Sequence, residues 1–391
     1  MKIGIISLMD SAEWAGSEEL WYAMAERALK RGIAVTVCIL RPKGEHPKWK
    51  ALQRQGAQLF SEGAQDSYVR SLRYRIAART DLLGARMAAA ARDRLSPLRR
   101  FFATRPDVVL ISDGASIPKR STIGILMMHL AIQPYIILSQ ANLGEIPETP
   151  LRRVAASYYR NARHALFVAH DSIKATERQI VERLSNARVV RNPVNLESLE
   201  PVAWPQTPTL RFASVGRLFC LAKGQDILFA ALSDDRWRYR DWHLSLYGTG
   251  PDETYLRELA HFYAIDDRVS FCGQAEDIRA VWKSHHACLQ PSRFEGTPLA
   301  MVEAMICGRP VIGTAVAGIP EWVNEGRSGF VAPSATADSF AEALERAWAR
   351  REEWSAIGKD AREDALRLHD PNPGETLLSL VIDAAESQPG A

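Results

Sequence analysis

Apolar and amphipathic stretches alternate along the amino-terminal part of the chain. Residues 2–7 form a nearly continuous apolar run, residues 17–31 have apolar side chains at helical spacing, and residues 34–40 form a second apolar run. This order predicts a βαβ unit. Similar runs follow at residues 108–112, 135–139 and 166–169, with enough residues between them for crossover helices. The amino-terminal part is therefore predicted to be an α/β domain with a parallel sheet.

The same alternation resumes after a segment of different character. Residues 191–210 contain four prolines and no helical period, so we place a domain boundary there. The strands predicted beyond it are residues 212–215, 243–247, 269–271, 287–290, 310–313 and 329–332. Two helices, over residues 337–350 and then up to about Leu368, precede a proline-punctuated break and a last short helix. The pattern predicts two doubly wound sheets, in domains over residues 1–195 and 206–370, and a helix and tail over 371–391.

Bulk composition narrows the class of protein. Of the 391 residues, 47% are hydrophobic and 24% are charged, as is ordinary for a globular protein with a sizeable core. The formal net charge of +3 is too small to indicate nucleic-acid binding. The five cysteines are widely spaced without a CxxC pair, and the first residues lack the features of a secretory signal. We therefore expect a cytoplasmic protein.

Charge is concentrated in one part of the chain. Residues 70–105 contain ten arginines and only two aspartates. This stretch could make peripheral contact with anionic lipid headgroups on the inner face of the plasma membrane. It could equally form a pair of solvated cationic helices without a ligand. The sequence leaves both interpretations open.

Residues 292–310 (SRFEGTPLAMVEAMICGRP) carry the most informative chemistry. They predict a turn followed by a helix, with Thr297 as the N-cap, Pro298 at the first helical position and Gly308 closing the helix. The amide groups of the first turn, at the positive end of the helix dipole, would form a site for a diphosphate. The block therefore predicts an anion site at a helix start.

Two glutamates flank this helix start. Glu303 lies five residues beyond Pro298, or roughly 7 Å along the helix axis, which is about the reach from a phosphate to a ribose. Glu295 lies in the loop before the helix, where it could hydrogen-bond to a transferred sugar. Considered without their neighbours, two glutamates eight residues apart are more often ordinary surface carboxylates. The surrounding residues favour the functional interpretation.

The block resembles the E-x7-E signature of the retaining GT-B glycosyltransferases of glycosyltransferase family 4, the glycosyl transferases group 1. The residues that carry the resemblance are Glu295, Gly296, Pro298, Glu303, Ala304, Gly308 and Pro310. It implies two Rossmann-like domains facing a central cleft, with a carboxy-terminal helix that crosses back to the first domain. It also implies that a nucleotide-diphosphate sugar is bound by Gly296, Thr297, Pro298, Leu299 and Glu303.

Two residue pairs ahead of the block, each of one basic residue and one glycine, also match the family. They are Gly216-Arg217 and Lys223-Gly224. The resemblance implies that Gly216 lies against the donor and that Arg217 and Lys223 face its diphosphate, forming the catalytic set with Glu295. Fixed cations can stabilise the charge that develops on a pyrophosphate leaving group. We therefore expect no cofactor and no metal requirement.

Further turns resemble donor-binding loops of the family. Gly248 and Gly250 occupy its strand-end glycine turn, Cys272 its nucleotide-side turn, and Gly16 the glycine-rich loop after the first strand. The resemblance implies that these residues line the donor site. Each could also be only a structural turn.

The acceptor side departs from the family pattern. The family often has a histidine after the strand predicted at residues 135–139, but this chain has Gln140, with Asn142 close by. Neither amide can act as a base, so the departing phosphate would have to accept the acceptor's proton. His170 follows another predicted strand and is a third acceptor-side candidate, although Asp171 or Ser172 could instead cap a helix there.

These inferences predict a retaining, metal-independent hexosyltransferase. Its partners would be a nucleotide sugar and a glycan, lipid-linked or small-molecule acceptor, in cell-surface polysaccharide or glycoconjugate synthesis. The alternatives are a nucleotide-sugar-binding protein of the same fold without turnover, and a GT-B phosphorylase or epimerase. A dinucleotide-dependent oxidoreductase and a P-loop nucleotidase are disfavoured, because the chain lacks both the G-x-G-x-x-G opening and a G-x4-G-K-[ST] match.

Overall fold

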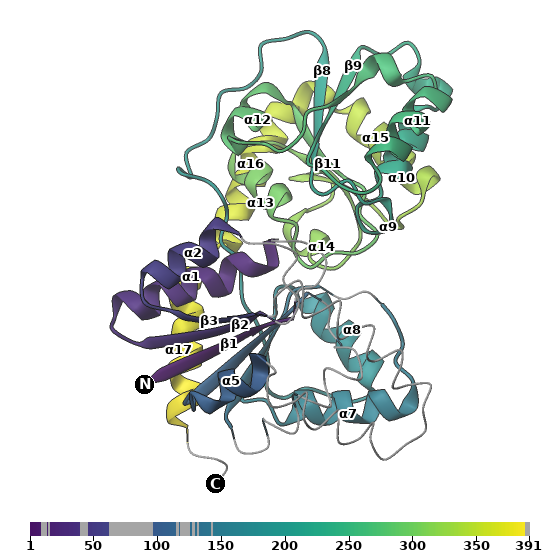
Figure 1. Cartoon of the computed structure of the whole chain (residues 1–391). Coiled ribbons are helices and arrows are strands. Elements are labelled where there is room, and N and C mark those ends of the chain that lie inside the picture. Colours follow the sequence, from purple (N-terminus) through teal and green to yellow (C-terminus); the bar gives the residue numbers. More distant parts are fainter. Residues whose placement is uncertain are drawn as a thin grey trace. The chain divides into compact units, whose positions relative to one another are not determined.

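The computed structural model describes residues 1–8, 14, 16–39, 46–61, 97–114, 117, 126, 130, 133–141 and 144–387. The chain divides into two compact units (Figure 1). The first unit comprises Met1–Val168, Ile173–Pro193 and Pro371–Ala391, and the second comprises Ala169–Ser172 and Val194–Asp370. Apart from Ala169–Ser172, the chain therefore passes from the first unit to the second after Pro193 and returns after Asp370.

A seven-stranded parallel sheet forms the centre of the first unit, with the order β3-β2-β1-β4-β5-β6-β7. Its strands are β1 (Lys2–Ser7), β2 (Ala34–Ile39), β3 (Gln58–Ser61), β4 (Val108–Asp113), β5 (Tyr135–Ser139), β6 (His164–Phe167) and β7 (Ala187–Val189). The helices are α1 (Gly16–Lys30), α2 (Pro47–Arg54), α5 (Pro97–Ala103), α7 (Thr149–Arg160), α8 (His170–Ile180) and α17 (Pro373–Glu386). Helices α1, α2 and α17 pack in one apolar core, and α5 and α7 pack in another. Alternate residues of the same strands contribute to the two cores, which therefore lie on opposite faces of the sheet. Burial on both faces explains why these strands are continuous apolar runs.

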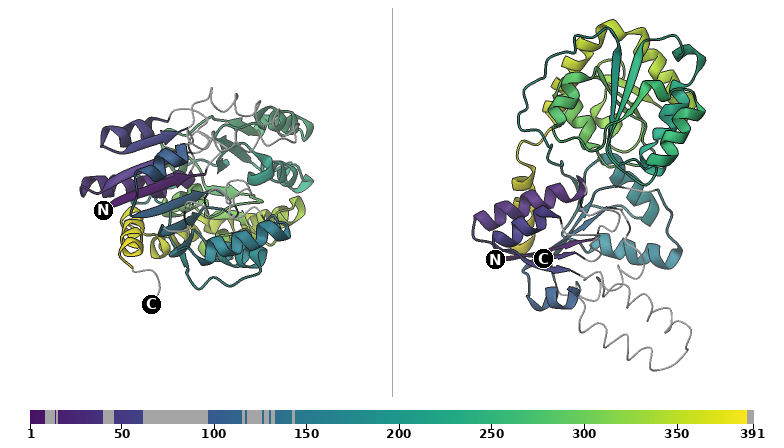
Figure 2. Two further views of the ribbon diagram at one scale, coloured as in Figure 1. Left: turned by 60° about the horizontal axis from the view of Figure 1, so that its bottom comes forward. Right: turned by 45° about the horizontal axis from the view of Figure 1, so that its top comes forward.

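The last helix belongs to the amino-terminal unit. In both views of Figure 2, α17 lies beside that unit's sheet, and it packs directly against α1. A Cβ added at Gly374 would lie 2.8 Å from the backbone oxygen of Ala23, so glycine permits this close approach. Arg31 and Glu375 add an ion pair of 2.7 Å. The predicted return of the carboxy-terminal helix to the first domain is confirmed.

A six-stranded parallel sheet forms the centre of the second unit, with the order β10-β9-β8-β11-β12-β13. Its strands are β8 (Leu210–Val215), β9 (Trp242–Tyr247), β10 (Val269–Phe271), β11 (Ala287–Gln290), β12 (Val311–Thr314) and β13 (Gly329–Ala332). The helices are α9 (Cys220–Lys223), α10 (Gln225–Leu232), α11 (Glu253–Phe262), α12 (Ile278–Ser284), α13 (Leu299–Ile306), α14 (Ile319–Trp322), α15 (Ala337–Ala349) and α16 (Trp354–Leu368). Helices α10, α11 and α15 share one core, and α12, α13 and α14 share the other. Each unit is thus doubly wound, which confirms the predicted fold class.

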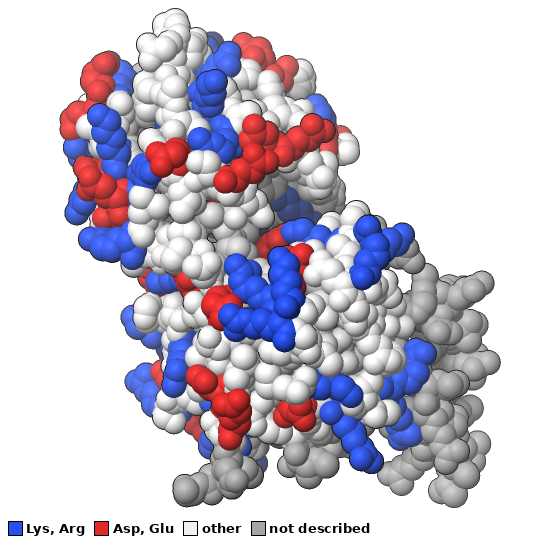
Figure 3. Space-filling model, turned by 90° about the vertical axis from the view of Figure 1, so that its left-hand side faces the viewer, with Lys and Arg blue, Asp and Glu red and all other residues white. Residues whose placement is uncertain are grey.

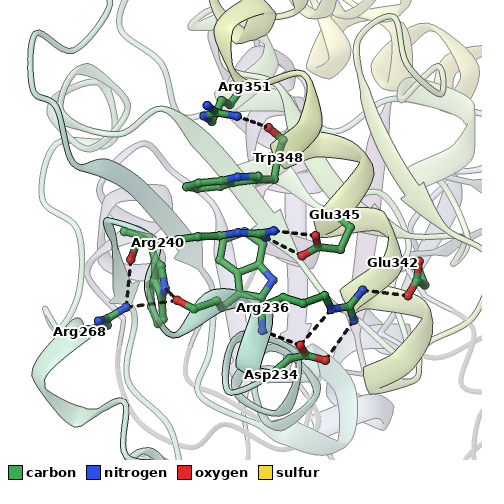
Figure 4. A network of polar contacts seen from close by, with 10 residues as sticks. Asp234, Arg236, Arg240, Arg268, Glu342, Glu345, Trp348 and Arg351 are labelled. Atoms are coloured by element: carbon green, nitrogen blue, oxygen red, sulfur yellow. Dashed lines mark hydrogen bonds and ion pairs between the residues drawn. The ribbon is translucent and has the colours of Figure 1, made fainter.

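An arginine between two indole rings holds one side of this second core together (Figure 4). The Arg240 guanidinium lies 4.7 Å from the ring centroids of both Trp237 and Trp348. Its two Nη atoms donate to the Glu345 carboxylate at 2.6 and 2.8 Å. Because Trp348 and Glu345 lie on α15, the arrangement fastens this helix to the turn before β9.

Several predicted boundaries were wrong by one or two residues. The strand predicted at residues 166–169 is β6, His164–Phe167, because parallel pairing with β5 and β7 ends at Phe167 although Val168 and Ala169 remain buried. The strand predicted at residues 310–313 is Val311–Thr314. The sequence pattern missed β3 and β7, which form the two edges of the first sheet. None of the helices in the described part of the chain combines the length and apolarity needed to cross a bilayer.

Candidate functional site

Three loops meet at the carboxyl ends of β8, β9 and β10, the edge where parallel α/β sheets bind ligands. The backbone N–H of Gly216 donates to the Tyr247 oxygen at 2.8 Å, and the N–H of Gly248 donates to the Gly273 oxygen at 2.6 Å. A Cβ at Gly248 would lie 2.0 Å from the Gly216 oxygen, and a Cβ at Gly250 would lie 2.1 Å from the Leu218 oxygen. These predicted donor-site glycines are therefore needed for backbone packing, and Cys272 is exposed beside them.

The α9–α10 corner brings a lysine to the loop after β11. Gly224 has φ of 65°, and a Cβ there would lie 2.0 Å from the Pro291 oxygen, so only glycine allows the two loops to touch. Lys223 closes α9, and its Nζ lies 2.6 Å from Glu295 Oε1. Two predicted catalytic residues, 72 residues apart in the chain, are thus in direct contact.

Arg217 takes a more exposed position at the same edge of the sheet. Its guanidinium lies 5.5 Å from the centre of the Phe219 ring, and its side chain is exposed to solvent. The Nε2 of Gln225 donates to the Arg217 backbone oxygen at 2.9 Å, which fixes the loop while leaving the guanidinium outside. The Arg217 guanidinium is therefore left exposed at this edge of the sheet.

Arg293 locks the loop that carries Glu295, a role that the sequence did not indicate. It contacts Asp226 through two hydrogen bonds of 2.6 and 2.7 Å, and its Nη1 also donates to the Cys220 oxygen at 2.7 Å. The backbone N–H groups of Arg293 and Phe294 both donate to the Ala222 oxygen. These contacts fix the spacing between Lys223 and Glu295. The only sequence signal was an arginine within the glutamate block.

The helix after this loop begins one residue later than predicted. Pro298, with ψ of 118°, is the N-cap of α13, and Leu299 is the first helical residue, so Thr297 is not the cap. The loop instead turns at Gly296, whose oxygen accepts the N–H of Gly318 at 2.8 Å. The N–H groups of the first turn of α13 have no acceptor within the helix itself, which is the condition for an anion site at a helix start. Gly308, with φ of 80°, follows the helix end as predicted.

Glu303 is buried on α13, with 4% of its surface exposed, and is not a solvated helix carboxylate. Its Oε1 accepts the backbone N–H of Asn195 at 2.8 Å. Burial is the main cause that raises the pKa of the neighbouring Cys288 thiol, and the charge of Glu303 raises it further. The carboxylate is thus held next to the first residues of the segment that enters this unit.

The first unit places its candidates at the carboxyl edge of its own sheet. Gly16 opens α1, and the same first turn contains Glu18, which is 2% exposed. Burial raises the pKa of Glu18 to about 7, although hydrogen bonds from Trp21, Ser7 and Ser17 oppose the shift. A carboxyl group that titrates near neutrality at this edge was not predicted from the sequence.

Gln140 is paired with another amide. Its Nε2 donates to Asn192 Oδ1 at 3.2 Å, and Asn192 Nδ2 donates back to Gln140 Oε1 at 2.8 Å. Gln140 is buried at the end of β5, and Asn192 is half-buried. Asn142, the other amide that we considered, lies outside the described residues.

His170 is the first residue of α8 and groups with the second unit. Its ring Nδ1 lies 3.2 Å from Glu321 Oε2, and Glu321 Oε1 accepts the backbone N–H groups of His170 and Asp171. Glu321 therefore satisfies the start of this helix, where Asp171 or Ser172 had been considered as the cap. The His170 ring is therefore already in contact with the Glu321 carboxylate.

Most of the arginine-rich stretch, residues 70–96, lies outside the described residues. Of its described members, Arg100 lies 5.8 Å from the centre of the Phe60 ring. On the face shown in Figure 3, described Lys and Arg side chains are interspersed with Asp and Glu. The membrane hypothesis therefore remains a prediction. No metal-binding group of three His, Cys, Asp or Glu side chains occurs among the residues that the structure describes.

Part of the chain is similar to known glycosyltransferases. Residues 209–350 match the family model described as Glycosyl transferases group 1. The chain is 33% identical to the putative colanic acid biosynthesis glycosyltransferase WcaL of Escherichia coli over 155 residues, which are 38% of each protein. It is 30% identical to a subunit of the human phosphatidylinositol N-acetylglucosaminyltransferase over 186 residues, 47% of this chain and 38% of that one. The chain thus spans about two fifths of the length of these relatives.

Among solved structures, HepE of Anabaena, in complex with UDP-glucose, matches 98% of both chains with a TM-score of 0.69 and 18% identity. This likeness shows the GT-B fold. Together with the family match, it confirms the resemblance to the group 1 glycosyltransferases that residues 292–310 indicated.

Proposed function

We propose that this chain is a retaining glycosyltransferase that transfers a sugar from a nucleotide-diphosphate donor to a hydroxyl acceptor. The observation that carries the proposal is the Lys223–Glu295 contact of 2.6 Å, located between the glycine loops and the start of α13. A cation, a carboxylate and a helix amino terminus lie close together there, a combination suited to binding a phosphorylated sugar.

The two cations would act on the leaving group. Breaking the bond between the sugar and the diphosphate leaves negative charge on the phosphate oxygens, and Arg217 and Lys223 would supply positive charge to stabilise it. Because these groups can neutralise the developing charge, we propose that transfer needs no metal ion and no cofactor. Undiminished transfer in the presence of EDTA is the expected result.

The two glutamates would bind different parts of the donor. Glu303 is fixed by the Asn195 N–H, and we propose that it accepts hydrogen bonds from the ribose hydroxyls. Glu295 adjoins the lysine that faces the diphosphate, so we assign it to the hydroxyls of the transferred sugar. The diphosphate would therefore be bound by the amide groups of the α13 first turn and by the two cations. The ribose would be bound by Glu303, and the transferred sugar by Glu295.

Retention of configuration follows from the proposed route for the acceptor proton. An amide cannot remove a proton, so Gln140 does not replace a basic histidine. We propose that the departing phosphate takes the proton from the acceptor hydroxyl on the same face of the sugar. Gln140, Asn142 and His170 remain candidates for orienting the acceptor.

The acceptor class is proposed from the relatives. One of them is named for colanic acid biosynthesis and another for a phosphatidylinositol substrate. We propose a glycan or lipid-linked acceptor in cell-surface polysaccharide or glycoconjugate synthesis, and a cytoplasmic protein that meets lipid-linked acceptors at the membrane. Cell fractionation and vesicle flotation of the full chain test this location.

A thermal-shift screen followed by a transfer assay tests the proposal. The protein is heated with UDP, GDP and ADP and with their sugars, and the nucleotide that raises the melting temperature is then used as donor with candidate acceptors. Transfer supports the proposal. Binding without transfer to any acceptor would favour a nucleotide-sugar-binding protein, and cleavage by inorganic phosphate or sugar epimerisation would favour the other GT-B enzymes.

A further inference from the structure

The Glu295 carboxylate is held by one oxygen only. Its Oε1 lies 2.6 Å from Lys223 Nζ, accepts the Ser292 hydroxyl at 2.9 Å, and accepts Gln290 Nε2 at 3.1 Å. Its Oε2 has no hydrogen-bond partner among the residues that the structure describes. The two oxygens of one buried side chain are therefore in different situations, and the unpartnered one is available to a ligand.

The two neutral donors belong to the rigid part of the unit. Gln290 is the last residue of β11, and its Nε2 also donates to Ser292 Oγ at 2.7 Å. Ser292 is fully buried, and its backbone oxygen accepts the Thr314 hydroxyl, at the end of β12, at 2.6 Å. Two adjacent strands of the sheet thus fix the positions of both donors.

The orientation of the Gln290 amide is set by its partners. With Nε2 directed at Ser292 and Glu295, the amide oxygen is buried without a hydrogen-bond partner in the described part of the chain. Reversing the amide would place that oxygen against the Glu295 carboxylate, which also accepts hydrogen bonds only. An unsatisfied buried acceptor is unfavourable, so its presence indicates that the bonds to Ser292 and Glu295 determine the arrangement.

Lys223, the third donor to Glu295, differs from the other two because it is charged and would also contact the donor diphosphate. Lys223 is 28% exposed and lies on a flexible side chain, and the proposed function requires its charge for the donor diphosphate. When the lysine turns toward a phosphate, its bond to Glu295 weakens. The bonds from Gln290 and Ser292 do not depend on the donor, so they keep the carboxylate in place during this exchange.

We propose that Gln290 and Ser292 are positioning residues for Glu295. They hold Oε1 and thereby present Oε2 to a hydroxyl of the transferred sugar. This inference rests on the proposed function, because it assumes that a sugar lies beside Glu295. It predicts that the pair affects recognition and transfer of the sugar but not binding of the nucleotide.

The test uses Ser292→Ala, Gln290→Met and the double variant of the full chain. Ser328→Ala is the matched control, because Ser328 is also fully buried in this unit and its Oγ accepts the Asn324 N–H at 2.8 Å, away from Glu295. Calorimetry measures Kd for UDP, GDP and ADP and for UDP-glucose, GDP-mannose and ADP-glucose. Steady-state kinetics with the active donor and crystal structures of the unliganded wild type and double variant complete the test.

We expect each single variant to lower kcat about tenfold to a hundredfold, the range for losing one hydrogen bond to a charged group. Kd for the nucleoside diphosphate should change less than about twofold, while the additional affinity contributed by the sugar is lost. In the double variant, the Glu295 carboxylate should turn fully toward Lys223. Ser328→Ala should leave all of these values unchanged.

Two results would overturn the inference. One is a double variant whose Glu295 carboxylate stays in its wild-type position, a result that needs no ligand. The other is an equal loss of affinity for the nucleoside diphosphate and its sugar, which would indicate a general disturbance of the site. Wild-type protein that binds none of the six nucleotides would instead count against the proposed function, and the structural comparison would still decide the positioning role.

Discussion

Glu18 provides a sharp test of the packing in the first unit. It lies in the first turn of α1 with 2% of its surface exposed, and burial raises its pKa from 4.5 to about 7. The folded state therefore binds a proton more tightly than the unfolded state does. The proton's contribution to stability is complete below about pH 4.5, declines as the pH rises through 7, and is absent above it.

The size of the effect follows from the shift. A change of one pKa unit corresponds to about 1.4 kcal/mol, so the wild type should lose on the order of 3 kcal/mol of stability across this window. Glu18→Gln cannot ionise and should show no such loss. The variant's advantage over the wild type should thus grow by on the order of 3 kcal/mol between about pH 5 and about pH 8.

The assay is urea unfolding at a series of pH values, with amide hydrogen exchange of α1 as a readout specific to this unit. Glu177→Gln is the control of opposite sign. A hydrogen bond from the Leu184 N–H is the main cause that lowers the pKa of Glu177, so its contribution is present above about pH 4.5 and lost only below. A stability difference between Glu18→Gln and wild type that stays constant from about pH 5 to about pH 8 would refute the reasoning.

Three further predictions concern the second unit. Lys223→Ala and Arg217→Ala should each lower kcat by about tenfold to a thousandfold through loss of charge at the leaving group, and wild-type turnover in either variant would remove that argument. Glu303→Ala should raise the donor Kd about tenfold or more with a smaller change in kcat, and calorimetry against the free nucleoside diphosphate decides this. Gly250→Ala should lower both the melting temperature and donor affinity, since its Cβ would lie 2.1 Å from the Leu218 oxygen; an unchanged variant would show that the loops can separate freely.

The central strands of both sheets could be predicted because they are buried on both faces. The runs of β1 and β5 are mostly apolar, and the structure buries all of their residues except Lys2, which is half-buried. The edge strands lack this signal: β3 (QLFS) has no fully buried residue, and β7 is three residues long. Their existence depends on a neighbouring strand that a local pattern does not reveal.

The residue types of the candidate site could also be predicted, but their contacts could not. The glutamate block and the two basic pairs are local patterns. That Lys223 contacts Glu295 depends on a glycine at position 224 that lets two distant loops touch. Likewise, the Gln140–Asn192 pair joins residues 52 positions apart. The N-cap of α13 is Pro298 rather than Thr297, and the loop before it is held by a hydrogen bond from the Gly318 N–H that a local pattern does not reveal.

The anomeric configuration of the product tests the account most directly. Proton NMR of a complete reaction mixture, with the donor identified by thermal shift, follows the anomeric signal of the sugar in donor and product. We predict the same configuration in both, and no product signal with the Arg217→Ala, Lys223→Ala double variant. Product of inverted configuration, or equal product formation by the double variant, would contradict the proposed retaining transfer at this site.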